Sequence, residues 1–384
     1  MNQYATLRIP LQAENIELII DYIYYPYLCK AHYMATAKKK VKSPTKSKGT
    51  PVKKSAPQKV KKPEIKSIQK AITPVKSALP QPATAWAGKV PFVKQGKYAD
   101  GLPFNDLNYL CFKLILKPNR FISRASLFDL VKVMKKPAAE CGCLFKTEGY
   151  IVTPVKIREV VFADTPDFKL YNNGFILRRR ICYEDGFPTT DPEIVFKYRS
   201  TDLQVAASTD VRPQIQGDFR VKFKCQALPL KDELGGIRML YSHNVQFPRS
   251  SIKTNDVLAF DNMAKIFPVL QKLNTGNGEK IKLVNDCIVE EVLQDIGVLD
   301  LGDGLKAKAN MAIWRTRGEH RPLIAELAYQ IKFSDRAELK LQQMERAERY
   351  FVALQYACKD WISLDATKTG VVYRALGNRP ISHE

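Results

Sequence analysis

The sequence predicts an α+β protein in which strands dominate, helices flank them, and a lysine-rich segment precedes the folded part. Three observations support this prediction. After residue 98, apolar and polar residues alternate in several segments, as expected for antiparallel strands with one buried face. Two segments instead repeat apolar residues every three or four positions, which is typical of helices. Before residue 98 the chain contains too little apolar material to build a core.

The first 97 residues divide at Met34, where an aromatic-rich stub (1–33) gives way to the sequence MATAKKKVK. The change in composition is sharp, and we expect Met34 to be the native start. Residues 34–97 contain 17 Lys, no Arg and one acidic residue, so they supply most of the net charge of +22. We predict that this segment is a disordered tail, because it lacks the apolar residues that offset the entropy of ordering.

A short pattern recurs in the tail as SPTK (43–46), TPVK (50–53) and TPVK (73–76). The proline restricts the backbone to an extended or turned form, and a cation follows it; these cations are Lys46, Lys53 and Lys76. The pattern is similar to the tail repeats of linker histones. Such a tail can neutralise the phosphates of DNA or RNA without reading their sequence. A solvated linker that only aids solubility is the alternative.

Cysteine usage and hydropathy limit the class of protein. Eight cysteines are too sparse in 384 residues for a disulfide scaffold, so we expect reduced thiols. No apolar run approaches the roughly 20 residues of a membrane-spanning helix. We expect a cytoplasmic protein, and the tail leaves association with the nucleoid open. The sequence contains no nucleophile elbow and no HExxH motif, which disfavours serine-hydrolase and zinc-protease chemistry.

The predicted strands begin at residue 112. They are FKLILK (112–117), REVVFA (158–163), FILRRRI (175–181), EIVFKYR (193–199), FRVKFKC (219–225), MAIWRTR (311–317) and LIAELAYQIKF (323–333). Several of them alternate apolar and polar residues, and the alternation in 219–225 is the cleanest. One helix is predicted over 255–267, ending before Pro268, and a longer one over about 335–362.

The polar faces of these strands are rich in cations and poor in acids. They carry Lys113, Lys117, Arg178, Arg180, Lys197, Arg199, Arg220, Lys222, Lys224, Arg315 and Arg317, with Glu326 and Glu193 as the acidic candidates. If these faces point outward, they form an ordinary basic surface. If they point into a closed barrel, they crowd one lumen, which is tolerable only around water or a polyanion. Such a lumen suits a short chain of phosphates. The alternation alone leaves both orientations open.

One stretch, DTPDFKLYNNGFILRRR (164–180), resembles the signature of the CYTH, or triphosphate tunnel metalloenzyme, superfamily. In that family a strand ends in an aromatic residue and DTP, a short helical turn with Leu and Gly follows, and the next strand ends in LRxR. The matching residues here are Asp164, Thr165, Pro166, Leu170, Gly174, Leu177, Arg178 and Arg180. EIVFK, WRTR, AELAYQI and TKTG (367–370) resemble later parts of the family more loosely, so the resemblance spans about 105–375.

The resemblance implies a closed or nearly closed eight-stranded antiparallel β-barrel over 98–384, with a C-terminal helix and a basic tunnel. Together with the alternation, it predicts that phosphate is bound by Lys117, Arg178, Arg180, Lys197, Arg199, Lys222, Lys224, Arg315 and Arg317. The expected ligand is tripolyphosphate, polyphosphate or a nucleoside triphosphate. Family members hydrolyse such ligands with Mg²⁺ or Mn²⁺, which neutralises the phosphates and activates water.

The metal-binding half of the family pattern is incomplete here. The family's first strand reads ExExK, whereas KLILK has Lys113 and Ile115 where the glutamates are expected. On the late strand Glu326 is a candidate metal ligand, but Ala328 stands at the next acidic position. Three functions stay open: a metal-dependent triphosphatase or polyphosphatase, a polyphosphate-binding module without turnover, and a nucleic-acid-associated protein that acts through its tail.

Overall fold

A computed structural model describes residues 90–381, apart from residue 151 and the segments 254–257 and 274–277. All of these residues belong to one compact unit, Pro74–Glu384. The predictions made for the stub (1–33) and for the tail cations therefore lie outside the described residues; these cations are Lys46, Lys53 and Lys76.

Residues just before the predicted boundary at residue 98 contact the folded unit. Val90 and Val93 pack against the main hydrophobic core. Arg336 donates a hydrogen bond to the carbonyl oxygen of Pro91 (2.9 Å), and its guanidinium lies over the ring of Phe92. Residues 90–97 are thus held against the barrel by both apolar and polar contacts.

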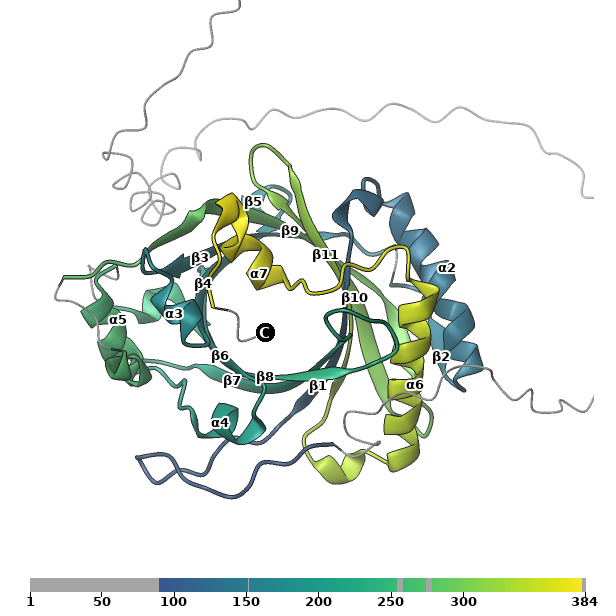
Figure 1. Cartoon of the computed structure of the whole chain (residues 1–384), viewed down its shortest axis with the longest axis horizontal. Helices are drawn as coiled ribbons and strands as arrows, with labels where there is room; N and C mark the ends of the chain where they lie inside the picture. The colour runs from purple at the N-terminus through teal and green to yellow at the C-terminus, as the bar shows by residue number, and fades with distance from the viewer. Residues whose placement is uncertain (1–89, 151, 254–257, 274–277, 382–384) are drawn as a thin grey trace, which may run out of the picture. The chain divides into compact units, whose positions relative to one another are not determined.

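The described strands form one sheet that closes on itself (Figure 1). Around the barrel the order is β10 (Lys306–Thr316), β11 (Pro322–Lys332), β1 (Tyr109–Leu116), β7 (Arg220–Leu228), β8 (Arg238–Pro248), β6 (Glu193–Ser200), β4 (Phe175–Glu184), β3 (Lys156–Asp164) and β9 (Lys282–Asp300), which pairs with β10 again. Two short strands extend the sheet at its edges, namely β2 (Leu144–Lys146) beside β9 and β5 (Phe187–Pro188) beside β4.

The prediction of a closed barrel with flanking helices is confirmed, but the predicted number and direction of the strands were wrong. Nine strands close the barrel, and β1 runs parallel to β7 while the other pairs are antiparallel. An odd number of strands cannot close with antiparallel neighbours throughout, so one parallel pair is a geometric necessity. The two barrel strands that the sequence did not predict are β8 and β9.

The helices lie outside the barrel or at its ends. They are η1 (Pro118–Arg120), α2 (Ala125–Glu140), α3 (Lys169–Asn172), α4 (Leu203–Ser208), η2 (Arg249–Ser251), α5 (Phe260–Ile266), η3 (Pro268–Lys272), η4 (Arg336–Glu338), α6 (Leu341–Ala357), α7 (Lys368–Tyr373) and η5 (Ala375–Gly377). The helix predicted over 335–362 is realised as α6, and the helix predicted over 255–267 is realised as α5 before Pro268. Among the described residues, no helix has both the length and the apolar character that crossing a membrane requires.

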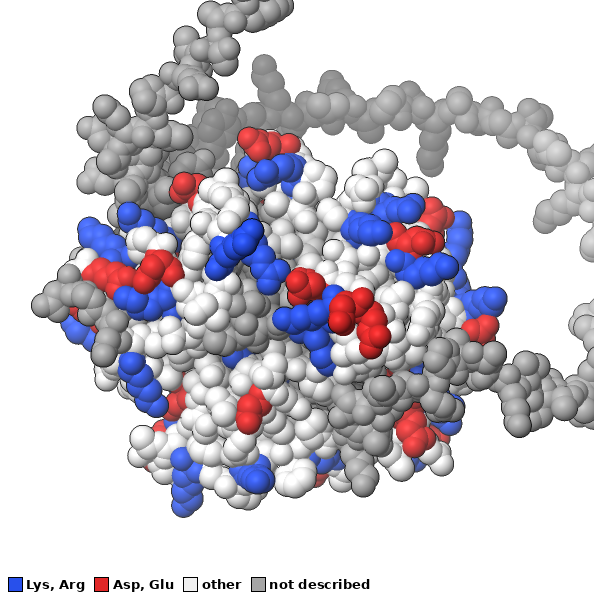
Figure 2. Space-filling view, in the orientation of Figure 1, with Lys and Arg blue, Asp and Glu red and all other residues white. Residues whose placement is uncertain are grey.

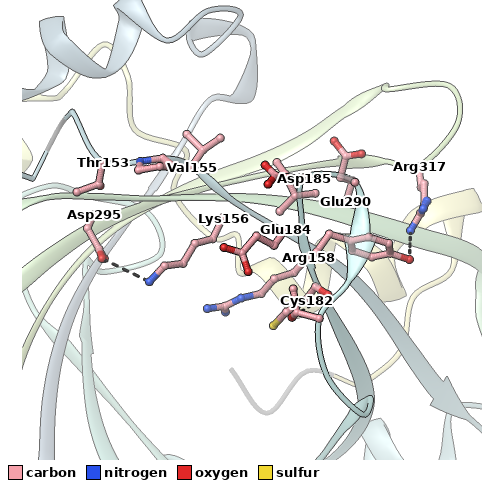
Figure 3. Close-up of a pocket in the computed structure, with 15 residues that line it drawn as sticks. Thr153, Val155, Lys156, Arg158, Cys182, Glu184, Asp185, Glu290, Asp295 and Arg317 are labelled. Carbon is pink, nitrogen blue, oxygen red and sulfur yellow. Dashed lines mark hydrogen bonds and ion pairs between the residues drawn. The ribbon is translucent and has the colours of Figure 1, made fainter. Parts of the chain in front are cut away.

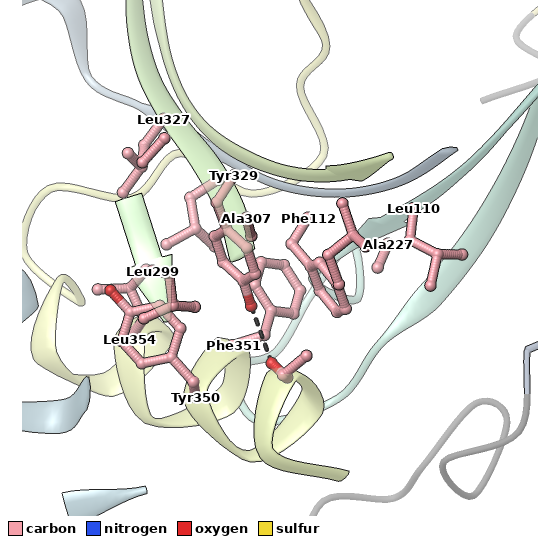
Figure 4. Packing of buried hydrophobic residues seen from close by; sticks show 14 of the residues in the cluster. Leu110, Phe112, Ala227, Leu299, Ala307, Leu327, Tyr329, Tyr350, Phe351 and Leu354 are labelled. Atoms are coloured by element: carbon pink, nitrogen blue, oxygen red, sulfur yellow. Dashed lines mark hydrogen bonds between the residues drawn. The ribbon is translucent and has the colours of Figure 1, made fainter. Parts of the chain in front are cut away.

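The apolar faces of the strands point outward, where helices cover them. On one side α6 packs on β1 and β11: Phe112 stacks on Tyr329 with ring centroids 4.6 Å apart, and Phe351 of α6 contacts both rings (Figure 4). The hydroxyl of Tyr329 donates to the carbonyl oxygen of Ala347 in α6 (2.8 Å). α5 and η3 cover another part of the wall, where Phe267 stacks on Phe196 of β6 at 4.0 Å.

On β1, β4, β6, β7 and β11 the apolar face points outward, so the polar face of these five strands points into the barrel. At one end of the barrel, beside α3 and α7, the interior is lined by apolar and aromatic side chains. There Tyr373 of α7 stacks on Tyr171 of α3 with centroids 4.1 Å apart and meets Phe162 of β3 edge-on. The outer surface seen in Figure 2 mixes Lys and Arg with Asp and Glu.

Candidate functional site

The turn between β3 and α3 carries the first half of the DTP signature. The buried carboxylate of Asp164 accepts hydrogen bonds from the backbone N–H groups of Thr165 (2.7 Å), Leu170 (2.8 Å) and Tyr171 (2.9 Å). Burial raises the pKa of Asp164 to about 6, and the three N–H donors act in the opposite direction. Asp164 therefore holds the first turn of α3 and fixes where β4 begins.

Gly174 allows the chain to return from α3 into β4. Its φ is +80°, and a Cβ atom at this position would lie 2.8 Å from the carbonyl oxygen of Arg199. The N–H of Arg199 donates to the carbonyl oxygen of Gly174 (2.8 Å), so the two backbones touch directly. Only glycine accommodates both the positive φ and this approach, which brings the start of β4 against the end of β6.

Two rows of polar side chains cross the interior from β6 through β8 to β7. The first row is Lys197, Asn244 and Lys222, and the second is Arg199, Ser242 and Lys224. On the neighbouring strand β4, Arg178 lies opposite Val195, two positions before Lys197 on β6, and so faces the same side of the sheet. The barrel thus brings together cations from the three strands β4, β6 and β7.

These five cations form what we call the interior cationic cluster: Arg178, Lys197, Arg199, Lys222 and Lys224. Only 6% of the Lys197 surface and 7% of the Arg199 surface are exposed. Within the part of the chain that the structure describes, no carboxylate forms an ion pair with Arg178, Lys197, Lys222 or Lys224. Lys224 donates to Oε1 of Gln330 (3.2 Å), which is a neutral acceptor.

Burial and mutual repulsion lower the pKa values of this cluster. Burial lowers the pKa of Arg178 to about 9, and the charge of Arg180 adds to the shift. Burial also lowers the pKa of Lys222 to about 8, with Lys224 contributing repulsion. The pKa of Lys197 falls well below its ordinary value for the same two reasons. A polyanion among these groups would relieve both the desolvation and the repulsion.

A second group of interior residues forms a chain of ion pairs beside the cluster. Glu326 of β11 contacts the ammonium groups of Lys113 (3.4 Å) and Lys368 (3.0 Å). Lys368, at the start of α7, also contacts Glu291 of β9 (3.2 Å), and Glu291 contacts Arg158 of β3 (3.3 Å). Burial alone would raise the pKa of Glu326, but Lys113 and Lys368 outweigh it and hold the pKa at about 2.

Arg180 also faces the interior but has an acidic partner. It forms an ion pair with Glu193, which lies directly opposite on β6. Gln246 of β8 donates to the other oxygen of Glu193 (2.6 Å). Arg180 is therefore closer to charge balance than Arg178, although both belong to the LRxR signature.

Three of the predicted phosphate ligands lie away from the interior cationic cluster. Lys117 follows the end of β1, is exposed, and donates to the carbonyl oxygen of Asp360 (3.2 Å). Arg315 forms an ion pair with Glu290, and Arg317 forms one with Glu159. Along β10 it is Trp314, 1% exposed, that faces inward, so its neighbour Arg315 faces outward. Arg315 and Arg317 therefore lie outside the interior cationic cluster, and their role as phosphate ligands stays a prediction.

A pocket of about 860 Å³ lies at the rim where β3 begins and β4 ends (Figure 3). Arg158 and Cys182 lie opposite each other there, and Lys156 reaches toward Asp295 (3.8 Å). The same pocket is lined by Arg317, which donates to the hydroxyl of Tyr183 (2.9 Å). The pocket shares Arg158 with the chain of ion pairs in the interior.

The residues around Glu326 do not fit a divalent cation held by the protein. Its interior neighbours on the adjacent strands are Ile115 and Ala312, which offer no oxygen ligands. Magnesium and manganese prefer carboxylate and water oxygens, whereas Glu326 is already in contact with Lys113 and Lys368. Within the described ranges, no three His, Cys, Asp or Glu side chains come together as a metal site.

Sequence reasoning missed two participants, Glu291 and Lys368. Glu291 lies on β9, whose alternation is broken where Asn285 and Asp286 adopt positive φ beside a register shift against β3. Lys368 follows Thr367, whose hydroxyl accepts from the N–H of Gly370 (2.9 Å) and caps α7. The TKTG segment carried that helix-start signal, but nothing in it indicated that the helix reaches the barrel interior.

No family model and no curated protein matches the chain, whereas 17 solved chains match it. One is a candidate adenylyl cyclase of Hippeastrum that shows a dominant triphosphatase activity; it is 11% identical, with 72% of this chain and 100% of that chain covered and a TM-score of 0.33. Candidate adenylate cyclases of Vibrio parahaemolyticus and Bacillus halodurans are each 10% identical. They cover 69% and 68% of this chain, with 98% and 94% of their own chains covered and TM-scores of 0.27 and 0.28.

Proposed function

We propose that this protein binds an inorganic polyphosphate, or the triphosphate chain of a nucleotide, inside its barrel. The interior cationic cluster carries the proposal, because four of its members face one interior without a carboxylate partner among the described residues. Buried cations in such a group are strongly penalised unless a counter-charge accompanies them. A bound polyanion supplies that charge.

A linear polyphosphate suits the interior better than other polyanions do. Its oxygens can bridge cations on β4, β6 and β7, and arginine can hold two oxygens of one phosphate at once. A nucleic-acid duplex cannot enter, since a barrel of about this strand number holds side chains and one small ligand. The ligand class is therefore a short, flexible chain of phosphates.

Binding, without turnover, is the function that the interior supports best. Hydrolysis requires water to be activated and the developing charge to be neutralised, and the resembled family does this with Mg²⁺ or Mn²⁺. Here Glu291 and Glu326 are engaged by Arg158, Lys113 and Lys368. Phosphate release from tripolyphosphate and from ATP, measured with Mg²⁺, Mn²⁺ or EDTA, tests this part. Turnover by the wild type that is lost in Lys197→Gln would show an enzyme.

Calorimetric titration of the full chain with tripolyphosphate tests binding itself. We expect Lys197→Gln to weaken binding by roughly 10- to 100-fold, the size of one hydrogen bond to a charged group. The matched control is Lys132→Gln, which removes an exposed lysine of α2. Both variants keep the same tail, so any binding by the tail is common to them. Equal affinities in the two variants would contradict the proposal.

A further inference from the structure

Every carboxylate oxygen of the interior ion-pair chain already contacts a cationic or N–H donor. Oε1 of Glu326 lies 3.0 Å from the Lys368 ammonium, and Oε2 lies 3.4 Å from that of Lys113. Oε1 of Glu291 accepts from Nε1 of Trp314 (2.8 Å) and from Lys368 (3.2 Å), while its Oε2 contacts Arg158 (3.3 Å). Each of the four oxygens therefore already has a donor.

The negative charge of the two carboxylates in this chain is already more than offset without a metal. The two carboxylates face three cations, namely Lys113, Lys368 and Arg158. Both acids are buried, with Glu326 6% and Glu291 5% exposed, so a divalent ion between them would be close to the ammonium of Lys368 in a medium that screens charge weakly. The ammonium groups of Lys113 and Lys368 supply the positive charge that a metal ion would otherwise supply to these carboxylates.

We propose that Lys113 and Lys368 replace a divalent metal in this protein, so that the barrel binds polyphosphate in its metal-free form. This inference rests on the proposed function. A polyphosphate that carries Mg²⁺ has lost negative charge, and the ion that it brings finds no free carboxylate. The lysines favour the fully charged ligand, and the metal-bound form should bind more weakly.

The fluorescence of Trp314 can report ligand binding in the barrel interior of the full chain. Its ring lies 5.0 Å from the Lys368 ammonium, and its indole N–H binds Glu291. Of the other two tryptophans, Trp361 packs on Phe121 outside this network, and Trp86 lies outside the described residues. The part of the fluorescence change that disappears in Trp314→Phe therefore reports the interior and excludes binding by the tail.

The test is a fluorescence titration of the full chain with tripolyphosphate, once in EDTA and once with Mg²⁺ in excess over phosphate. We expect saturable binding in EDTA and affinity at least about threefold weaker with Mg²⁺, the size expected from a modest charge interaction. Binding in EDTA with equal or tighter affinity under Mg²⁺ would overturn the metal-free inference but keep the proposed function. Binding that requires Mg²⁺ would also overturn the metal-free inference and keep the proposed function. No interior response in either buffer would overturn both.

The variant Lys113→Glu tests the same inference by putting an acidic residue in place of one of the two lysines. It places a carboxylate beside Glu326, and we expect binding in EDTA to be lost and Mg²⁺ to restore it. The control Lys132→Glu makes the same charge change on the exposed face of α2 and should behave as the wild type. If Lys113→Glu does not fold, Lys368→Gln and Lys113→Gln replace it: each should weaken binding in EDTA several-fold, and unchanged affinity in both would overturn the inference.

Discussion

Three consecutive arginines in β4 have three different environments. Arg178 faces the interior without an ion-pair partner among the described residues, Arg180 faces the interior beside Glu193, and Arg179 faces outward. Arg179 pairs with Glu159 at 2.8 Å. Strand parity predicted this division from the sequence, since side chains alternate between the faces of a strand. Which face was the interior could not be deduced from parity.

The sequence did not show which acidic residues pair with the interior cations. Glu193 and Glu326 were visible as candidates, because each lies in a predicted strand. Glu291 was not, because its strand is irregular and its three donors come from β3, β10 and α7. A long-range ion-pair chain of this kind depends on which strands become neighbours, and that information is not local in the sequence.

The titration of Lys222 gives a prediction at the residue scale. Its pKa in the folded protein is about 8, below the value of about 10.4 for an unfolded lysine. Between these pH values the unfolded chain binds more protons, so Lys222 makes the free energy of unfolding rise with pH, and its destabilising effect is complete below pH 8. Buried thiols act oppositely in the same range, since burial raises the pKa of Cys143 and Cys358 to about 12.

The contribution of Lys222 is therefore measured as the difference in the free energy of unfolding between the wild type and Lys222→Met. The free energy of unfolding is measured by denaturant for the wild type and for Lys222→Met from pH 7 to pH 10. We expect Lys222→Met to be more stable than the wild type at pH 7, and this advantage to be smallest at pH 10. Lys132→Met, at an exposed position of α2, should show no such trend. A stability difference that does not change with pH would contradict the depressed pKa.

At the scale of elements, the cleanest alternations were predicted correctly, and the irregular elements were not. Each predicted strand segment overlaps one strand of the structure; these strands are β1, β3, β4, β6, β7, β10 and β11. β8 was missed because its residues are buried on both faces, so Ser242 and Asn244 inside alternate with buried His243 and Val245 outside and no exposed polar face marks the strand. α2 contains Pro137 near its end, which obscures the helical pattern.

α7 is the element that closes one end of the barrel, and its packing can be tested. Tyr373 is fully buried against Tyr171, Phe162 and Phe168. Tyr373→Ala should lower the free energy of unfolding by about 3–5 kcal/mol, because it leaves a cavity of aromatic size. Tyr373→Phe keeps the ring and should cost much less, and chemical denaturation of both variants measures the difference. Equal losses would mean that the hydroxyl, and not the ring, holds α7.

At the scale of the whole molecule, the closed barrel and the inward cations follow from one arrangement. Helices α2, α5 and α6 cover the apolar outer face, so the other face of every strand must line the interior. The sequence predicted seven of the nine barrel strands and the helices α5 and α6, but not the closure with nine strands, which depends on the parallel pairing of β1 with β7. That pairing joins residues more than 100 positions apart.

The basic tail gives a separate prediction about nucleic-acid binding. We expect a variant that begins at residue 90 to lose affinity for duplex DNA while its interior response to tripolyphosphate stays unchanged. Residue 90 is preferable to residue 98 as a start, since Val90 and Val93 pack on the core. Fluorescence anisotropy with a labelled duplex at two salt concentrations measures the loss and its electrostatic origin. Retained DNA affinity would assign nucleic-acid binding to the barrel unit.

The comparison of Arg178→Gln with Arg179→Gln tests the interior site most directly. The two variants remove the same charge from adjacent positions, one facing the interior and one paired outside with Glu159. Calorimetric titration of both full-length variants with tripolyphosphate should show binding weakened by roughly tenfold or more in Arg178→Gln. The affinity of Arg179→Gln should equal that of the wild type. Equal affinity in the two variants, or a greater loss in Arg179→Gln, would contradict a phosphate-binding interior.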